Sequence, residues 1–308
     1  MARRRRRERG RNVHGILLLD KPAGITSNEA LQRVKTLYQA RKAGHTGSLD
    51  RMATGLLPLC FGEATKFSGY LLDADKTYDV ICQLGIETAT GDLDGEILRE
   101  MPLPELSSPA IEKVLERYRG DISQIPPMFS ALKHKGKRLY ELAYQGIEVE
   151  RETRTVTIYQ LDLLGFDAPL LHLHVRCSKG TYIRTLAGDL GRDLGCGACV
   201  HRLRRTGAGP FAEHEMVGME EIERLAAQGF EEMDKRLLTM DSALRQLPRV
   251  ELNRHVADFI REGQAVIVPH APTSGLLRIY SDNNDFLGLG EVLDDGRVAP
   301  RRLVNIRS

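Results

Sequence analysis

The sequence predicts an α+β protein with two folded parts. Segments with helix and strand periodicity are interspersed without a regular strand–helix–strand repeat, which argues against a parallel α/β sheet. The chain has 308 residues, a length typical of two domains. After residues 246–248 short apolar segments alternate with turn-forming residues, which indicates a small all-β module. We therefore divide the chain into a flexible basic tail at 1–11, a larger domain at 12–245 and a module at 246–308.

Charge is unevenly distributed along the chain. Lys and Arg total 44 and Asp and Glu total 42, a net charge of +2. Residues 1–11 hold seven Arg and one Glu, so this tail carries +6 and the remaining chain −4. We therefore expect a polyanionic partner to be bound by the tail and by local basic patches.

Targeting, membrane and metal signals are weak. The apolar segment at 15–19 is too short for a signal peptide, and no segment approaches the ~18–20 apolar residues that span a bilayer. The cysteines are odd in number and dispersed, unlike a disulfide framework, and Cys196 and Cys199 lack the second pair of a four-ligand zinc site. We expect a soluble, cytoplasmic protein that binds neither metal nor membrane.

The larger domain begins with alternating element types. Residues 15–19 read as a buried strand that ends at Pro22, and Ser27 is placed to cap the helix that follows. A second helix is expected over 63–72. Alternating apolar positions then predict a half-buried strand over 78–84.

Later elements follow the same logic. Pro109 at a first helical position marks a helix start at Ser108. The remaining predicted elements are strands at 155–164 and 170–177, a helix at 183–194, and module strands at 265–268, 277–280, 286–292 and 303–306.

The segment Gly44–Gly55, GHTGSLDRMATG, is poor core material and carries several reactive side chains. Its glycines permit tight turns, and functional residues concentrate on such loops. From the residues alone two interpretations stay open. Asp50 is a functional carboxylate, or it caps a helix or binds local N–H groups.

This segment resembles the signature of the TruB family of pseudouridine synthases, GHTGxLDPxATG. Other segments resemble further motifs of that family, in the family's order, and the C-terminal module resembles a PUA domain. The resemblance implies a catalytic domain with a mixed, largely antiparallel central sheet flanked by helices. The other segments are LDKPAGITS at 19–27, DKTY at 75–78, IPPMFSALK at 125–133, SKGTYIRTL at 178–186 and LRR at 203–205.

The resemblance implies isomerisation of the T-loop uridine at tRNA position 55 to pseudouridine. The N1–C1′ bond is replaced by a C5–C1′ bond without redox change or group donor, so no cofactor is expected. Asp50 is implied as the catalytic carboxylate. Attack on C1′ and removal of the C2′ proton both stay open for it. Arg184 is implied as its partner, holding the carboxylate ionised by bidentate pairing.

The resemblance also implies how the extruded base is held. Tyr78 is implied to stack on the base and to act in the late proton transfer from C5. Tyr182 and Leu203 are implied as walls of the base pocket, and His45 as the group that stacks into the T-loop. From the residues alone, Tyr78, Tyr182 and Leu203 also fit ordinary packing, and His45 fits a loop hydrogen bond.

RNA contacts beyond the base are expected from exposed cations. We expect Lys21, Lys179 and Arg205 to contact phosphates, with the basic tail adding affinity that does not depend on sequence. The T-arm is the expected partner, the module is expected to reach the acceptor end, and a monomer is expected.

One position departs from the family pattern. Arg51 stands where the family has Pro, so the loop should be less preorganised, and a guanidinium there would lower the pKa of Asp50 or pair with phosphate. Three alternatives are kept open. They are a tRNA chaperone on the same scaffold, a guide-RNA-dependent relative, and a metal hydrolase using Asp50, His45, Asp92 and Asp94.

Overall fold

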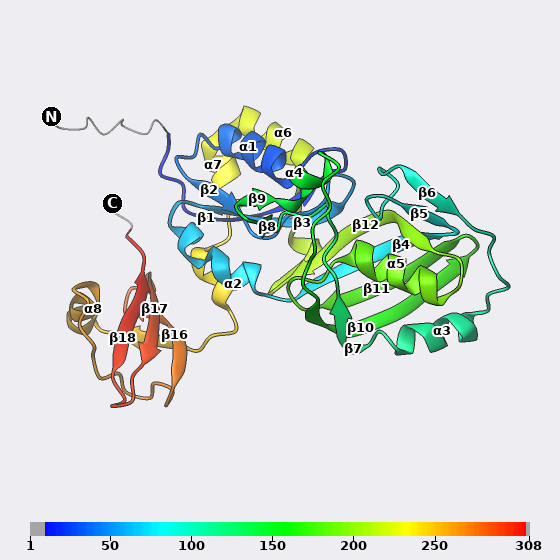
Figure 1. The fold of residues 1–308 in the computed structure, drawn as a ribbon. Coiled ribbons are helices and arrows are strands. Elements are labelled where there is room, and N and C mark those ends of the chain that lie inside the picture. The colour runs from blue at the N-terminus through cyan, green and yellow to red at the C-terminus, as the bar shows by residue number, and fades with distance from the viewer. Residues whose placement is uncertain (1–9, 306–308) are drawn as a thin grey trace.

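The computed structural model describes residues 10–305 and confirms the α+β class (Figure 1). A ten-stranded sheet forms the larger part, and most of the basic tail lies outside the described residues. In spatial order the sheet contains β14 (Val217–Gly218), β1 (Gly15–Lys21), β3 (Thr54–Phe61), β12 (Ala198–Ala208), β4 (Lys76–Leu84), β11 (Leu170–Cys177), β10 (Arg154–Asp167) and β7 (Gly120–Gln124), with β2 (Ala43–His45) on β3 and β13 (Phe211–Ala212) on β12.

The sheet is mixed and largely antiparallel, as predicted. Two of its strand pairs are parallel, β1 with β14 and β3 with β12. The β3–β12 pair places Gly55 opposite Arg205, directly after the loop that carries Asp50. This junction therefore positions the predicted catalytic loop against the centre of the sheet.

Helices cover the sheet in two groups (Figure 1). One group lies beside β1, and the other covers β10, β11 and β12, where the apolar side chains of the helix at 183–193 are buried. None of the helices described between residues 10 and 305 is long and apolar enough to cross a membrane. The first group is α1 (Ser27–Leu37), α6 (Met219–Gln228) and α7 (Phe230–Asp234), and the second is α3 (Ser108–Glu116) and α5 (Ile183–Asp193).

Two local predictions need correction. Thr26, not Ser27, caps α1, because the Thr26 hydroxyl accepts from the N–H of Glu29. Ser27 instead bonds both backbone groups of Leu49, at 2.8 and 3.1 Å, and so ties α1 to the Asp50 loop. The helix expected over 63–72 is divided into a 3-10 helix, η1 (Gly62–Phe67), and α2 (Ser68–Leu72).

Smaller pieces lie at the edges of the larger part. The hairpin β5–β6 precedes α3, and the segment between β7 and β10 forms an arm with a two-stranded hairpin and a short helix (Figure 1). Two further 3-10 helices precede the C-terminal module. The bounds are β5 (Ile86–Thr88), β6 (Ile97–Glu100), β8 (Lys133–His134), β9 (Lys137–Arg138), α4 (Leu139–Ala143), β14 as above, η2 (Glu213–Glu215) and η3 (Met240–Leu244).

The C-terminal module is a four-stranded sheet to which the structure adds one helix, α8 (Arg254–Arg261). The strand expected at 265–268 is only a single bridge, Val266 to Val298. The ring of Phe286 lies 5.4 Å from that of Phe67, so the module packs against η1. The strands are β15 (Arg249–Leu252), β16 (Gly275–Ser281), β17 (Phe286–Val292) and β18 (Val298–Leu303), the last beginning before the predicted 303–306.

The β3–β12 junction depends on the absence of a side chain at Gly55. Its φ is +98°, and a Cβ there would lie 2.3 Å from the carbonyl oxygen of Arg205. We expect Gly55→Ala to lower the free energy of unfolding by roughly 2–5 kcal/mol, through backbone strain and overpacking. Gly120→Ala is the matched control, because Gly120 has φ +84° and open space around it. Chemical denaturation measures both variants, and equal losses would contradict the close approach at Gly55.

Candidate active site

The loop that carries Asp50 lies between β2 and β3 and is held from two sides. Ser27 of α1 bonds Leu49, and the Arg205 guanidinium of β12 donates to the carbonyl of Gly47 at 3.1 Å. The carbonyl of Asp50 itself accepts from the N–H of Ala53 at 3.1 Å. The backbone around Asp50 is therefore fixed by both halves of the larger domain.

Asp50 and Arg184 form the ion pair that the sequence predicted. Arg184 Nε lies 2.8 Å from Asp50 Oδ2, and Arg184 Nη2 donates to Asp50 Oδ1 at 3.1 Å. The Asp50 side chain is 41% exposed, whereas that of Arg184 is only 6% exposed. The pair thus presents an accessible carboxylate on a buried guanidinium.

The buried guanidinium has further partners from distant segments. Arg184 donates to the carbonyl of Thr90 at 2.7 Å and to the carbonyl of Phe129 at 2.8 Å. Asp92 Oδ2 lies 3.9 Å from Arg184 Nε, with the Asp92 side chain 7% exposed. Sequence reasoning considered Asp92 only as a metal ligand and missed this role. No signal in the sequence links residues so far apart.

The pKa of Asp50 reflects opposing influences. Removal from water raises the pKa of Asp50 above its ordinary value of 3.8, Arg184 opposes that rise, and the neighbouring Asp92 carboxylate adds to it. Lys21 acts in the same direction as Arg184. Arg184 is therefore the main group that favours the ionised form of Asp50.

Aromatic and apolar side chains predicted to hold a base lie on neighbouring elements. Tyr78 of β4 is half-buried and pairs in register with Arg205, and Leu203 of β12 is buried. Burial raises the pKa of the Tyr78 phenol, and Arg205 opposes the rise, so the phenol keeps its proton near neutral pH. Tyr182 precedes α5, and its N–H donates to Gln124 Oε1 at 3.0 Å.

His45 lies in β2, half-buried beside the Asp50 loop. Its Nδ1 is buried and has no hydrogen-bond partner among residues 10–305. Burial and the nearby Arg205 lower the pKa of His45. Both influences favour the neutral imidazole.

The predicted phosphate contacts of Lys21 and Arg205 are wrong. Lys21 is fully buried and donates to the carbonyls of Pro22 and Ile25 at 2.8 and 2.7 Å, and burial lowers its pKa to about 8. Arg205 is 1% exposed and donates to the carbonyls of Leu56 and Gly47. Both cations support the loop backbone. Lys179 is exposed beside Asp73, 2.9 Å away, and its phosphate contact stays a prediction.

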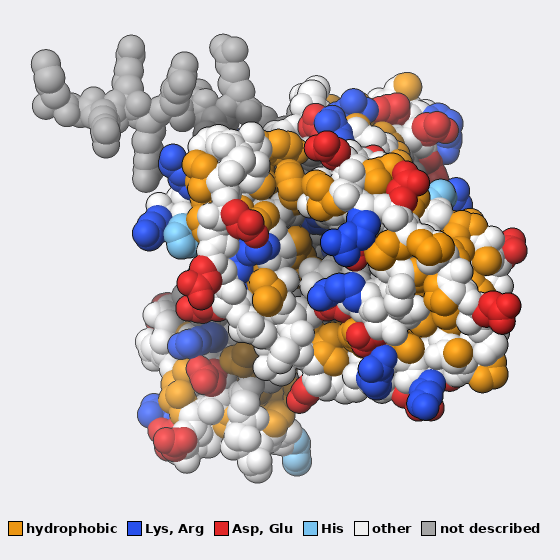
Figure 2. Space-filling view, turned by 45° about the vertical axis from the view of Figure 1, so that its right-hand side comes forward, with side chains coloured by type: hydrophobic (Ala, Val, Ile, Leu, Met, Phe, Trp, Pro, Cys, Tyr) orange, Lys and Arg blue, Asp and Glu red, His pale blue; other side chains and the backbone are white. Residues whose placement is uncertain are grey.

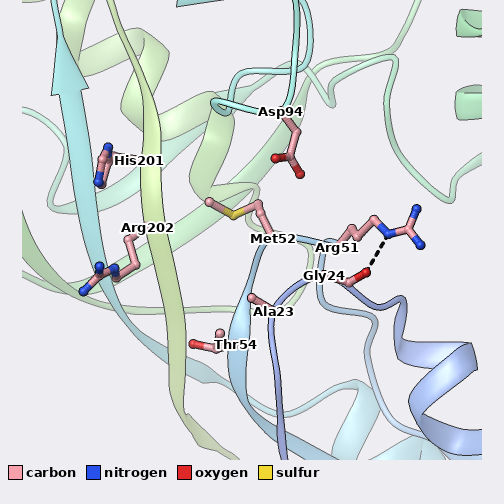
Figure 3. Close-up of a pocket in the computed structure, with 8 residues that line it drawn as sticks. All are labelled: Ala23, Gly24, Arg51, Met52, Thr54, Asp94, His201 and Arg202. Atoms are coloured by element: carbon pink, nitrogen blue, oxygen red, sulfur yellow. Dashed lines mark hydrogen bonds between the residues drawn. The ribbon is translucent and has the colours of Figure 1, made fainter.

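Arg51 is not among the principal charges acting on Asp50, while its expected pairing with phosphate stays a prediction. Its Nε donates to the carbonyl of Gly24 at 2.9 Å (Figure 3), and its Nη2 lies 3.7 Å from Glu29. The principal charges acting on Asp50 are instead Arg184, Asp92 and Lys21. Arg51 therefore fastens the loop to the turn after β1. It also lines a cavity of about 650 Å³ with Met52, Asp94, His201 and Arg202.

Within residues 10–305 no three His, Cys, Asp or Glu side chains are grouped so that they could hold a metal ion. Asp92, which the metal-hydrolase alternative required as a ligand, faces the Arg184 guanidinium instead. The five cysteines are buried as free thiols.

Family models match almost all of the described chain. The models are TruB family pseudouridylate synthase (N terminal domain) at residues 35–183, tRNA pseudouridylate synthase B C-terminal domain at 184–245, and Pseudouridine synthase II TruB, C-terminal, at 248–304. A tRNA pseudouridine synthase B of Coxiella burnetii is 54% identical over 96% of each chain. One of Pseudomonas aeruginosa is 55% identical over 96% of this chain and 97% of its own. The chain belongs to the TruB family of pseudouridine synthases.

Solved structures agree with this assignment at the level of fold. A Cbf5–Nop10–Gar1 complex matches this TruB-family chain with a TM-score of 0.70 and 27% identity, over 91% of this chain and 78% of that one. An H/ACA RNP bound to a substrate RNA containing 2′-deoxyuridine matches with a TM-score of 0.72 and 22% identity, over 97% and 90%.

The charges around Asp50 make a titration prediction. Asp92→Asn removes a like charge and should lower the pKa of Asp50, whereas Arg184→Gln removes the stabilising cation and should raise it. A raised pKa means that the ionised carboxylate is lost earlier as pH falls. Carboxyl ¹³C NMR titration measures both shifts. Asp189→Asn, on α5 but paired with Arg192, should leave the Asp50 titration unchanged, and an unchanged Asp50 in Arg184→Gln would contradict the assignment.

Proposed function

We propose that this protein converts the uridine at position 55 of the tRNA T-loop to pseudouridine, with Asp50 as the catalytic carboxylate. The observation that carries the proposal is the accessible Asp50 carboxylate held by the buried Arg184, with Tyr78 on a nearby strand. Relatives that share more than half of their residues with this chain bear the name tRNA pseudouridine synthase B, which supports tRNA as the substrate.

The reaction needs a charged carboxylate and no other reagent. The N1–C1′ bond breaks, the uracil rotates, and C5 bonds to C1′. The C5 proton is then lost, and N1 gains a proton. Whether Asp50 acts as a nucleophile at C1′ or as a base at C2′, its carboxylate must be ionised at the start of the reaction. The enclosed site removes water that would stabilise this charge, and Arg184 stabilises it instead.

We assign the side chains around Asp50 to holding the extruded nucleotide. Tyr78 stacks on the uracil, and its raised pKa favours stacking over action as a base in the free enzyme. Tyr182 and Leu203 wall the base pocket. His45, uncharged near neutral pH, replaces the extruded base in the stack of the T-loop, which offsets part of the few kcal/mol that extrusion costs.

The remaining RNA is proposed to be bound by shape and phosphate contacts. Lys and Arg side chains lie around the hollow at the centre of the face in Figure 2. We assign Lys179 and the basic tail to contacts with phosphates of the T-arm. The catalytic domain is assigned to residues 12–245. The PUA-like module, from residue 246 onward, is assigned to binding the acceptor end of the tRNA. We further propose that the protein acts as a monomer in the cytoplasm.

Replacement of Asp50 tests this function against the chaperone alternative. Asp50→Asn keeps the shape but removes the charge, so pseudouridine formation in an unmodified tRNA transcript should fall by at least ~10³-fold, while tRNA affinity stays within a few fold. Chemical mapping of pseudouridine and filter binding measure the two quantities. Asp162→Asn, on β10 and hydrogen-bonded to Gln160, is the matched control and should behave like the unaltered protein. Normal turnover by Asp50→Asn would remove Asp50 from its role.

A further inference from the structure

Ser130 is a buried polar side chain that the reaction scheme leaves without a role. Its residue is 5% exposed, and its Oγ has no hydrogen-bond partner among the described residues. Its backbone is fully engaged, because its N–H donates to Met128 O at 2.9 Å and its carbonyl accepts from Tyr140 at 3.1 Å. The hydroxyl is therefore held in place without a protein partner, which is uncommon for a buried group.

The position of Ser130 is fixed beside the catalytic pair. The preceding residue, Phe129, gives its carbonyl to the same Arg184 nitrogen that donates to Asp50. Gln124, at the end of β7, holds both backbone groups of Tyr182, at 3.0 and 3.3 Å. The arm that starts at Gln124 thus returns to the site at Phe129, and Ser130 is the next residue along it.

Ser130 lies close enough to the phenol of Tyr182 to affect its pKa, although the two hydroxyls form no hydrogen bond in the structure. Burial raises the pKa of the Tyr182 phenol. The neighbouring Ser130 hydroxyl opposes that rise more strongly than Arg154 and Arg184 do. Asp50 also raises the pKa of this phenol, by a smaller amount.

The cations around Asp50 are already committed. Arg184 is directed at Asp50 and two backbone carbonyls, Lys21 at carbonyls of its own loop, and Arg205 at Leu56 and Gly47. A uracil is neutral and presents two carbonyl oxygens and one N–H on its edge. Neutral hydroxyls are suited to such an edge, since a charged donor without its counterion would be costly to bury.

We infer that the Ser130 hydroxyl donates a hydrogen bond to a carbonyl oxygen of the extruded uracil and so helps to select it. The inference rests on the proposed function, because it requires a flipped base beside Asp50. It makes Ser130 a substrate-contacting residue of the arm, distinct from the carboxylate that performs the chemistry.

The test uses equilibrium binding in the Asp50→Asn background, so that no RNA is turned over. T-arm stem-loops carry uridine, 2-thiouridine, 4-thiouridine or 2′-deoxyuridine at the target position. Ser130→Ala should weaken binding of the uridine RNA roughly fivefold, the loss of one hydrogen bond. On one of the two thio RNAs, whose sulfur is a poor acceptor, the penalty should fall below about twofold. It should persist on the 2′-deoxy RNA.

Ser123→Ala is the matched control, because Ser123 is exposed on β7 just before the arm, and it should bind all four RNAs normally. An equal Ser130→Ala penalty on all four RNAs would show a merely structural role. A penalty lost only on the 2′-deoxy RNA would place the contact on the sugar, and no penalty on uridine would remove the contact. Each of these overturns the inference. Failure of the proposed function is seen separately, as absence of pseudouridine formation by the unaltered protein.

Discussion

The ion pair between Asp50 and Arg184 is the interaction on which the rest of the site depends. A carboxylate that must meet a nucleotide in a partly enclosed site tends to take up a proton, and only a fixed opposite charge prevents this. The guanidinium is itself buried, which is unfavourable unless its N–H groups are satisfied. The carbonyls of Thr90 and Phe129 and the carboxylate of Asp92 meet that need. The site is therefore a charge network in which one member, Asp50, faces outward.

The fold brings this network together from segments that are distant in sequence. Asp50 and Arg184 are 134 positions apart, and Arg184 and Thr90 are 94 apart. The parallel contact of β3 with β12 at Gly55 sets the loop, and α5 sets the guanidinium. Buried cations hold the backbone around the site. Lys21 donates to the carbonyls of Pro22 and Ile25, and Arg205 donates to those of Leu56 and Gly47. Of the three cations that the sequence suggested for RNA binding, Lys21 and Arg205 thus support the fold, and only Lys179 is exposed at the surface.

Much of the fold and the pairing of Asp50 with Arg184 can be predicted from the sequence. Which groups the other polar side chains bind cannot. Alternation in β11 and the apolar stripe of α5 identify their buried faces, and ordered motifs bring Asp50 and Arg184 together. The strand β12 is not evident from its Arg-rich sequence, because Ala198–Val200 are consecutive buried residues and the charged Arg205 is buried as well, so apolar and polar positions do not alternate. Burial of Lys21 and the link from Asp92 to Arg184 depend on tertiary contacts, which local patterns do not encode. Thr and Ser are both common helix-capping residue types, so the sequence does not show whether Thr26 or Ser27 caps α1. Only the tertiary contact of Ser27 with Leu49 separates their roles.

A double-mutant cycle tests most directly whether Asp50 and Arg184 act as one unit. Single-turnover rates on a T-arm stem-loop would be measured for Asp50→Asn, Arg184→Gln and the double variant. If the guanidinium acts through the carboxylate, the double variant should be no slower than Asp50→Asn within about threefold, because the second change removes a partner that no longer has a charge to hold. Losses that multiply across the two positions would show that the two residues act independently, and would contradict the account.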